Sequence, residues 1–228
     1  TGDAAAKDSA QVVEILEKFL RSGVDPAVAM KILNSVMLLR SSDAWGYATV
    51  DLMCVVLFTG DTCFDKYGAA PSYVKAGRSI RRIKGEALAA GLTLGGGIAP
   101  DIVRMRLKAG CTAVIASDGV LADAEEDGWL KELLGRAGDD MKALARLTVK
   151  EAEKLYGASD DMTVVTVQKV GDTLDGKTVT GVYDTILFYV GGDKLYIAWT
   201  AAVEGKYYRL YRTFSLSRRE MSAIRPNR

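Results

Sequence analysis

The sequence predicts an α+β fold, a sandwich built from helices and antiparallel strands. Two helical segments come first, short segments rich in Val, Ile, Tyr and Phe follow, and two further helices precede a last strand. Because the strands follow one another directly instead of alternating with helices, antiparallel sheets are favoured over a wound parallel sheet.

The two helices at the start are expected to form a hairpin. Apolar residues recur at helical spacing over residues 8–22, with Asp8 or Ser9 available as the N-cap. A second helix begins after Asp25, which caps it, and Pro26 occupies its first turn. The expected buried face of this second helix consists of Val28, Ile32, Val36 and Leu39.

The elements that follow are short segments bounded by Gly, Asp and Pro. Strands are expected over 47–58, 62–67, 72–76 and 80–84. A hairpin is expected from 102–108 and 111–117, helices over 127–135 and 139–156, and a closing strand over 162–170.

Residues 171–228 differ in character from residues 1–170. Nine of the 18 aromatic residues lie there, alternation predicts a β-hairpin or small meander, and the end is basic. We therefore expect a first domain over 1–170 and a β-hairpin-rich extension over 171–228. A partner-binding role for the aromatic hairpin is one alternative, with the first domain as its platform.

Composition excludes several classes of chemistry. The chain has 228 residues and no histidine, which excludes a Ser-His-Asp triad, a Cys-His pair and a His-ligated zinc. A formal net charge of +1 predicts no general attraction to nucleic acid. The three cysteines fit reduced thiols in the cytoplasm, and no apolar run predicts a membrane span or membrane contact.

Two acidic motifs could carry chemistry. Asp118 and Gly119 follow an apolar strand, and Asp160 and Asp161 precede another. Each motif therefore places a carboxylate at the end of a strand. Hard cations such as Mg²⁺ and Mn²⁺ need oxygen ligands from several chain segments. Each motif alone is also a common turn or cap, and only their joint occurrence is informative.

With these motifs the sequence resembles the PPM (PP2C-type) metal-dependent serine/threonine phosphatases, in particular phosphatase domains of the stage II sporulation protein E type. The resemblance extends over about residues 1–170. It is carried by 107–119, 157–167, 39–40, 47–52, 68–72 and 88–91, in the family's order.

The resemblance implies a β-sandwich flanked by antiparallel helices, with a dimetal centre of two Mn²⁺ or Mg²⁺ ions at one end. Asp118 and Asp160 match metal-ligand positions of the family, Asp161 is a second choice beside Asp160, and Gly119 matches the turn beside the metal. No catalytic residue beyond the metal ligands is implied, and the residues that bind substrate stay unknown.

The sequence departs from the family at its start. A metal-ligating Asp in an Asp-Gly-Met-Gly motif and the two strands before it do not occur here, so the fold is expected to be N-terminally truncated. The chain alone is therefore expected to be a feeble or an inactive phosphatase. A hairpin around Gly191-Gly192 could fill the place of those strands, although an unrelated extension is the preferred interpretation.

The expected function is hydrolysis of phosphoserine on a regulatory protein, such as an anti-sigma-factor antagonist, by a dimetal-activated water. The alternative is a pseudophosphatase that acts as a regulatory protein-binding module. The resemblance also leaves open a homodimer through the 8–40 helices and a membrane-anchored parent of this cytoplasmic chain.

Overall fold

The computed structural model describes residues 2–40, 47–56, 59–92, 99–123, 125–157, 160–170, 173–180, 185–191, 194–200 and 210–216. Side chains are described for 9–39 and for the described positions between 47 and 170.

The described residues form helices and antiparallel strands. The helices are α1 (Gly2–Arg21), α2 (Pro26–Arg40), α3 (Gly128–Arg136) and α4 (Met141–Tyr156). The strands are β1 (Val50–Val56), β2 (Asp61–Tyr67), β3 (Ser72–Ala76), β4 (Ser79–Ile83), β5 (Asp101–Arg106), β6 (Thr112–Ala116), β7 (Val164–Val170), β8 (Thr173–Thr180), β9 (Thr185–Gly191), β10 (Lys194–Thr200) and β11 (Leu210–Leu216).

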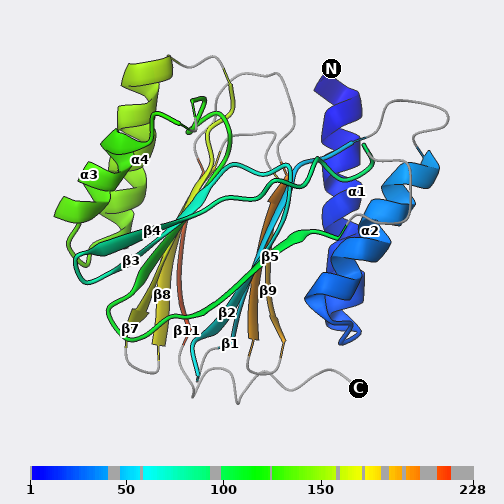
Figure 1. Cartoon of the computed structure of the whole chain (residues 1–228), viewed down its shortest axis with the longest axis horizontal. Coiled ribbons are helices and arrows are strands. Elements are labelled where there is room, and N and C mark those ends of the chain that lie inside the picture. Colours follow the sequence, from blue (N-terminus) through cyan, green and yellow to red (C-terminus); the bar gives the residue numbers. More distant parts are fainter. Residues whose placement is uncertain are drawn as a thin grey trace.

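The elements stack in four layers, which confirms the predicted sandwich (Figure 1). One sheet has the strand order β5-β2-β1-β10-β9 and the other β11-β8-β7-β6-β3-β4. Helices α1 and α2 cover the outer face of the first sheet, and α3 and α4 cover that of the second (Figure 1). None of the described helices combines the length and the hydropathy that crossing a bilayer requires.

Three apolar cores hold these layers together. Val12 and Leu33 belong to the core between the first helix pair and its sheet. Phe64 and Ile115 belong to the core between the two sheets, and Leu144 to the core under α3 and α4. The strands β1 and β6 lie between these cores and bury both faces, which explains why they are apolar almost throughout.

The predicted helical hairpin is confirmed, with one correction at its start. Helix α1 begins at Gly2 instead of near Asp8, because the alanine-rich stretch before Ser9 favours the helix. In α2, Asp25 accepts hydrogen bonds from the backbone N–H groups of Ala27 and Val28 at 3.0 and 3.3 Å, as expected of a cap.

The predicted buried face of α2 is wrong. Val28 and Leu39 are 47% and 79% exposed, and the residues that pack against the sheet are Ala29, Met30, Leu33 and Met37. Helix α2 is apolar around most of its circumference, so the periodicity of its sequence does not select one face.

The predicted hairpin of 102–108 and 111–117 is also wrong. β5 pairs with β2 in the first sheet, whereas β6 pairs with β3 and β7 in the second. The chain crosses between the sheets here, and Gly110 adopts a positive φ of 85° at the turn. A tight connection thus joins two layers instead of two neighbouring strands.

Strands from residues 171–228 complete both sheets. β10 pairs with β1, β9 pairs with β10, and β8 pairs with β7. The strand β8 was not predicted. The hairpin of β9 and β10 thus joins the first sheet, and the idea that it fills the place of the family's first strands stays a prediction; Gly192 lies outside the described residues. The division into domains at residue 170 stays a prediction.

A buried ion pair lies between the two sheets. Lys66 donates to Asp51 Oδ2 at 2.5 Å, to Ser72 Oγ at 3.0 Å and to the Ala70 carbonyl at 2.8 Å. The side chains of Lys66 and Asp51 are 1% and 0% exposed. Ser72 also donates to Asp51 Oδ2 at 2.8 Å, so the cluster ties β1 and β2 to β3.

A second buried carboxyl, Asp65, lies on the other face of β2, toward the helices. The Cys63 thiol donates to its Oδ1 at 3.3 Å, and among the described residues its Oδ2 has no hydrogen-bond partner. Burial raises the pKa of Asp65 to about 6. The native state therefore binds more protons than the unfolded chain between about pH 4 and pH 6.

We expect Asp65→Asn to increase the free energy of unfolding at pH 7 by about 2 kcal/mol. The pKa of this carboxyl is raised on folding, so its cost is absent below about pH 4, grows as the pH rises, and is complete above about pH 6. Urea denaturation of both proteins at several pH values measures the difference. Asp61→Asn is the control, because Arg106 lowers the pKa of Asp61 and any pH dependence has the opposite sign. A gain that does not change with pH contradicts the prediction.

Candidate metal centre

The two acidic motifs lie at the same end of two neighbouring strands, β6 and β7, of the second sheet. β6 ends at Ala116 and is followed directly by Ser117 and Asp118. In the antiparallel pair of β6 and β7, Ala116 is opposite Val164, so the end of one strand lies beside the start of the other. The residues just before β7, which include Asp160, are thereby brought next to the residues just after β6.

Ser117 holds the two loops together. Its backbone N–H donates to the Thr163 carbonyl at 2.9 Å, and its hydroxyl accepts from the Thr163 N–H at 2.9 Å. The same hydroxyl donates to the backbone carbonyl of Asp161 at 3.2 Å. Because Ser117 and Thr163 are fully buried, these bonds are shielded from water and fix how the loops approach.

The contact between the loops requires Gly119. A Cβ at this position would lie 2.2 Å from the carbonyl oxygen of Asp161 and 3.3 Å from Cβ of Asp160. No side chain fits in that space without moving one of the loops. The glycine therefore permits the close approach of Asp118 to Asp160.

The carboxyl groups of the site repel one another. Burial raises the pKa of Asp118 above its usual value, and the charge of Asp160 adds to the effect. The same two causes raise the pKa of Asp161. Asp161 is 4% exposed, and neither carboxylate oxygen has a hydrogen-bond partner among the described residues. A bound cation would relieve both the repulsion and the missing hydrogen bonds.

These residues fit a hard cation, and they supply only part of its ligands. Oδ1 of Asp118 accepts from the N–H of Gly119 at 3.1 Å, and Oδ1 of Asp160 accepts from the N–H of Asp161 at 2.8 Å, which leaves the other carboxylate oxygens available. Within the described ranges, no cluster of three or more Asp, Glu, Cys or His residues could hold a metal ion. Further oxygen ligands would have to come from water, substrate or other residues.

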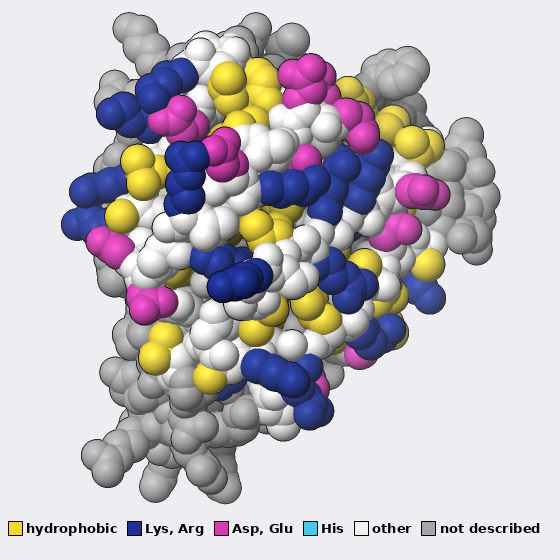
Figure 2. Space-filling model, turned by 60° about the vertical axis from the view of Figure 1, so that its left-hand side comes forward, with side chains coloured by type: hydrophobic (Ala, Val, Ile, Leu, Met, Phe, Trp, Pro, Cys, Tyr) yellow, Lys and Arg dark blue, Asp and Glu magenta, His cyan; other side chains and the backbone are white. Residues whose placement is uncertain are grey.

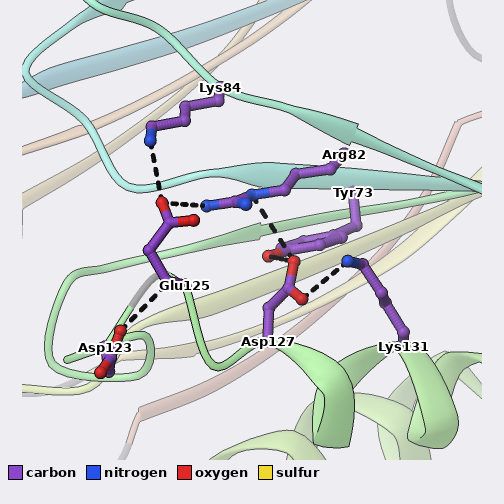
Figure 3. A network of polar contacts seen from close by, with 7 residues as sticks. All are labelled: Tyr73, Arg82, Lys84, Asp123, Glu125, Asp127 and Lys131. Carbon is purple, nitrogen blue, oxygen red and sulfur yellow. Dashed lines mark hydrogen bonds and ion pairs between the residues drawn. The ribbon is translucent and has the colours of Figure 1, made fainter.

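A polar network that the sequence did not reveal fixes the segment after Asp118. The hydroxyl of Tyr73 in β3 donates to Asp127 Oδ2 at 2.7 Å, and Lys131 donates to Asp127 Oδ1 at 2.7 Å (Figure 3). Arg82 approaches both Asp127 and Glu125 at 3.5 and 3.4 Å. The network joins β3 and β4 to the start of α3.

The ionisation of Asp127 follows from this network. Burial acts to raise its pKa, but hydrogen bonds from Lys131 and Tyr73 and the positive charge of Arg82 outweigh burial and lower it. Asp127 was expected only as the start of a helix. Its partner Tyr73 is 54 residues away in sequence, and no spacing rule links the two.

Basic side chains are prominent on the side of the molecule where α3 and α4 lie (Figure 1 and Figure 2). Figure 2 shows Lys and Arg gathered over one face, several of them beside Asp or Glu. Among the described residues, Glu125 pairs with both Arg82 and Lys84. Ion pairs therefore neutralise part of the positive charge.

The four-layer sandwich is the fold of PP2C-type phosphatase domains. The sequence model of the family "Stage II sporulation protein E (SpoIIE)" matches residues 1–170. The chain belongs to this family. The match ends with β7, so β8 to β11 lie beyond it.

Two relatives and one solved structure illustrate the similarity. Stage II sporulation protein E of Bacillus subtilis is 31% identical over 174 residues, which is 73% of this chain and 21% of that protein. That of Priestia megaterium is 29% identical over 72% of this chain and 29% of its own length. The chain thus spans less than a third of either relative.

The solved structure is the phosphatase domain of the cell fate determinant SpoIIE from Bacillus subtilis, presoaked with Mn. It superimposes with a TM-score of 0.51 at 29% identity, over 69% of this chain and 71% of that one.

Proposed function

We propose that this chain carries part of the catalytic site of a metal-dependent protein serine/threonine phosphatase. The observation that supports the proposal is the approach of the Asp118 loop to the Asp160 loop, with raised carboxyl pKa values at their contact. The Mn-presoaked phosphatase domain of SpoIIE is consistent with metal dependence.

Asp118 and Asp160 would hold Mn²⁺ or Mg²⁺, with Asp161 beside them. Metal ions bound there would polarise a water molecule and the phosphoryl oxygens of the substrate. The chain's own contribution is positional: Ser117 keeps the loops in register, and Gly119 lets the carboxylates approach. Tyr73 and Asp127 hold the segment that follows Asp118 against β3.

The proposed substrate is a phosphoserine in a regulatory protein such as an anti-sigma-factor antagonist. Membership of the SpoIIE family supports the class of substrate, and the particular protein is an inference by analogy. The three cysteines of the chain form no disulfide with one another, which supports action in a reducing compartment such as the cytoplasm.

We expect Asp118→Asn and Asp160→Asn each to lower Mn²⁺-dependent hydrolysis of a phosphoserine peptide at least a hundredfold in the full-length gene product. Metal ions contribute several kcal/mol to such a reaction, and each 1.36 kcal/mol is about tenfold in rate. Initial rates with saturating MnCl₂ and with a chelator give the comparison.

Asp123→Asn is the matched control, because it lies exposed a few residues beyond Gly119 and is expected to keep full activity. Full activity of Asp118→Asn, or turnover that resists the chelator, would overturn the proposal. Intact Mn²⁺ binding without any turnover would overturn it in favour of a non-catalytic binding module.

A further inference from the structure

A cavity lies between the start of α2 and the first sheet. Its volume is about 540 Å³, which is within the range of pockets that take small organic ligands. It is lined by residues of β1, β2 and β5 and by the turn that begins α2: Asp25, Pro26, Cys54, Val56, Asp61, Thr62, Cys63, Arg104, Met105 and Arg106.

The cavity is remote from the candidate metal centre. Asp51 in β1 accepts a hydrogen bond from Ser72 of β3. The next residue, Tyr73, pairs with Val114 of β6, and β6 leads to Asp118. Val56 lies five residues beyond Asp51, roughly 16 Å along the strand at about 3.3 Å per residue. The cavity is also on the helix side of the sheet, because Cys54 packs in the core under α1 and α2.

Two acidic residues of the cavity are already engaged. Asp61 accepts from Arg106 at 2.8 Å. Asp25 Oδ1 caps α2 through the N–H groups of Ala27 and Val28. A cationic ligand would therefore compete with Arg106 for Asp61 and with the helix cap for Asp25.

Arg104 is the cation that remains available. Within the described part of the chain it makes no hydrogen bond or ion pair, although the buried carboxyl of Asp65 attracts it. Arg104 is exposed and lines the cavity together with the apolar residues Met105, Val56 and Pro26. A guanidinium of this kind matches a carboxylate with two parallel hydrogen bonds.

We propose that this cavity binds a small organic carboxylate with an apolar body. The carboxylate pairs with Arg104, and the body lies against Val56, Cys54 and Pro26. Because a charge-assisted hydrogen bond is stronger than a neutral one, the loss of Arg104 should weaken binding tenfold or more. The site is independent of the phosphatase chemistry proposed above.

The probe is 4-phenylbutyrate, titrated into the full chain by isothermal calorimetry or by NMR. We expect saturable binding that Arg104→Gln weakens at least tenfold and that Val56→Trp abolishes by filling the cavity. The uncharged alcohol with the same body, 4-phenylbutanol, and the cation 4-phenylbutylamine should bind at least tenfold more weakly than the acid.

Arg81→Gln is the control, because Arg81 is exposed on β4 and does not line the cavity. It should bind the probe as the unchanged chain does, and thermal unfolding of each variant without probe confirms that it is folded. Equal affinity for the acid, the alcohol and the amine would overturn the assignment. So would an unchanged affinity in Arg104→Gln, or no saturable binding at millimolar probe.

Discussion

Replacing Lys66 with Met is expected to lower the free energy of unfolding by about 3–5 kcal/mol. The ammonium of Lys66 is the only cation within 4 Å of the Asp51 carboxylate among the described residues, and both side chains are removed from water. Oδ1 of Asp51 already lacks a hydrogen-bond partner, so the substitution would leave a buried charge with one hydroxyl contact, from Ser72. Urea denaturation followed by circular dichroism gives the value.

The double substitution Asp51→Leu with Lys66→Met separates the two contributions to that loss. Removing both charges also removes the uncompensated carboxylate, so most of the lost stability should return. Arg106→Met, which breaks the exposed pair with Asp61, is the control and should change stability little. If Lys66→Met alone costs less than about 1 kcal/mol, water reaches Asp51 and the ion pair is not the contact that joins the sheets.

The sequence predicted the buried face of a helix correctly where the apolar residues occupy a single face. The face of α1 with Val12 and Leu16 is separated from charged residues, and these residues are buried as expected. In α2 the apolar residues extend around the helix, so packing against the sheet decided which of them became buried. The sequence defined the position of the candidate site better than the packing of α2, because Asp118 and Asp160 each adjoin an apolar strand and those two strands pair.

What the sequence could not reveal depends on contacts between distant segments. Lys66 in an alternating strand is expected on a solvated face, yet it is 1% exposed because Asp51 and Ser72 lie opposite it. β8 was missed because Asp175 and Gly176 interrupt its apolar pattern, and its pairing with β7 outweighs their weak strand propensity. Propensity is local, whereas these outcomes were decided by the partner strand.

Replacing Gly119 with Ala is expected to cost about 3 kcal/mol of unfolding free energy, because the added Cβ would lie 2.2 Å from the Asp161 carbonyl oxygen. That oxygen accepts from Ser117, so neither loop can move without breaking this bond. As the loops separate, Asp118 and Asp160 separate as well, and Mn²⁺ affinity should fall more than a hundredfold. Gly128→Ala is the matched control: a Cβ there meets nothing within 4 Å, and stability should be unchanged or slightly higher. Thermal unfolding with and without MnCl₂ measures both quantities, and normal stability and metal affinity in Gly119→Ala would show that the two loops do not touch.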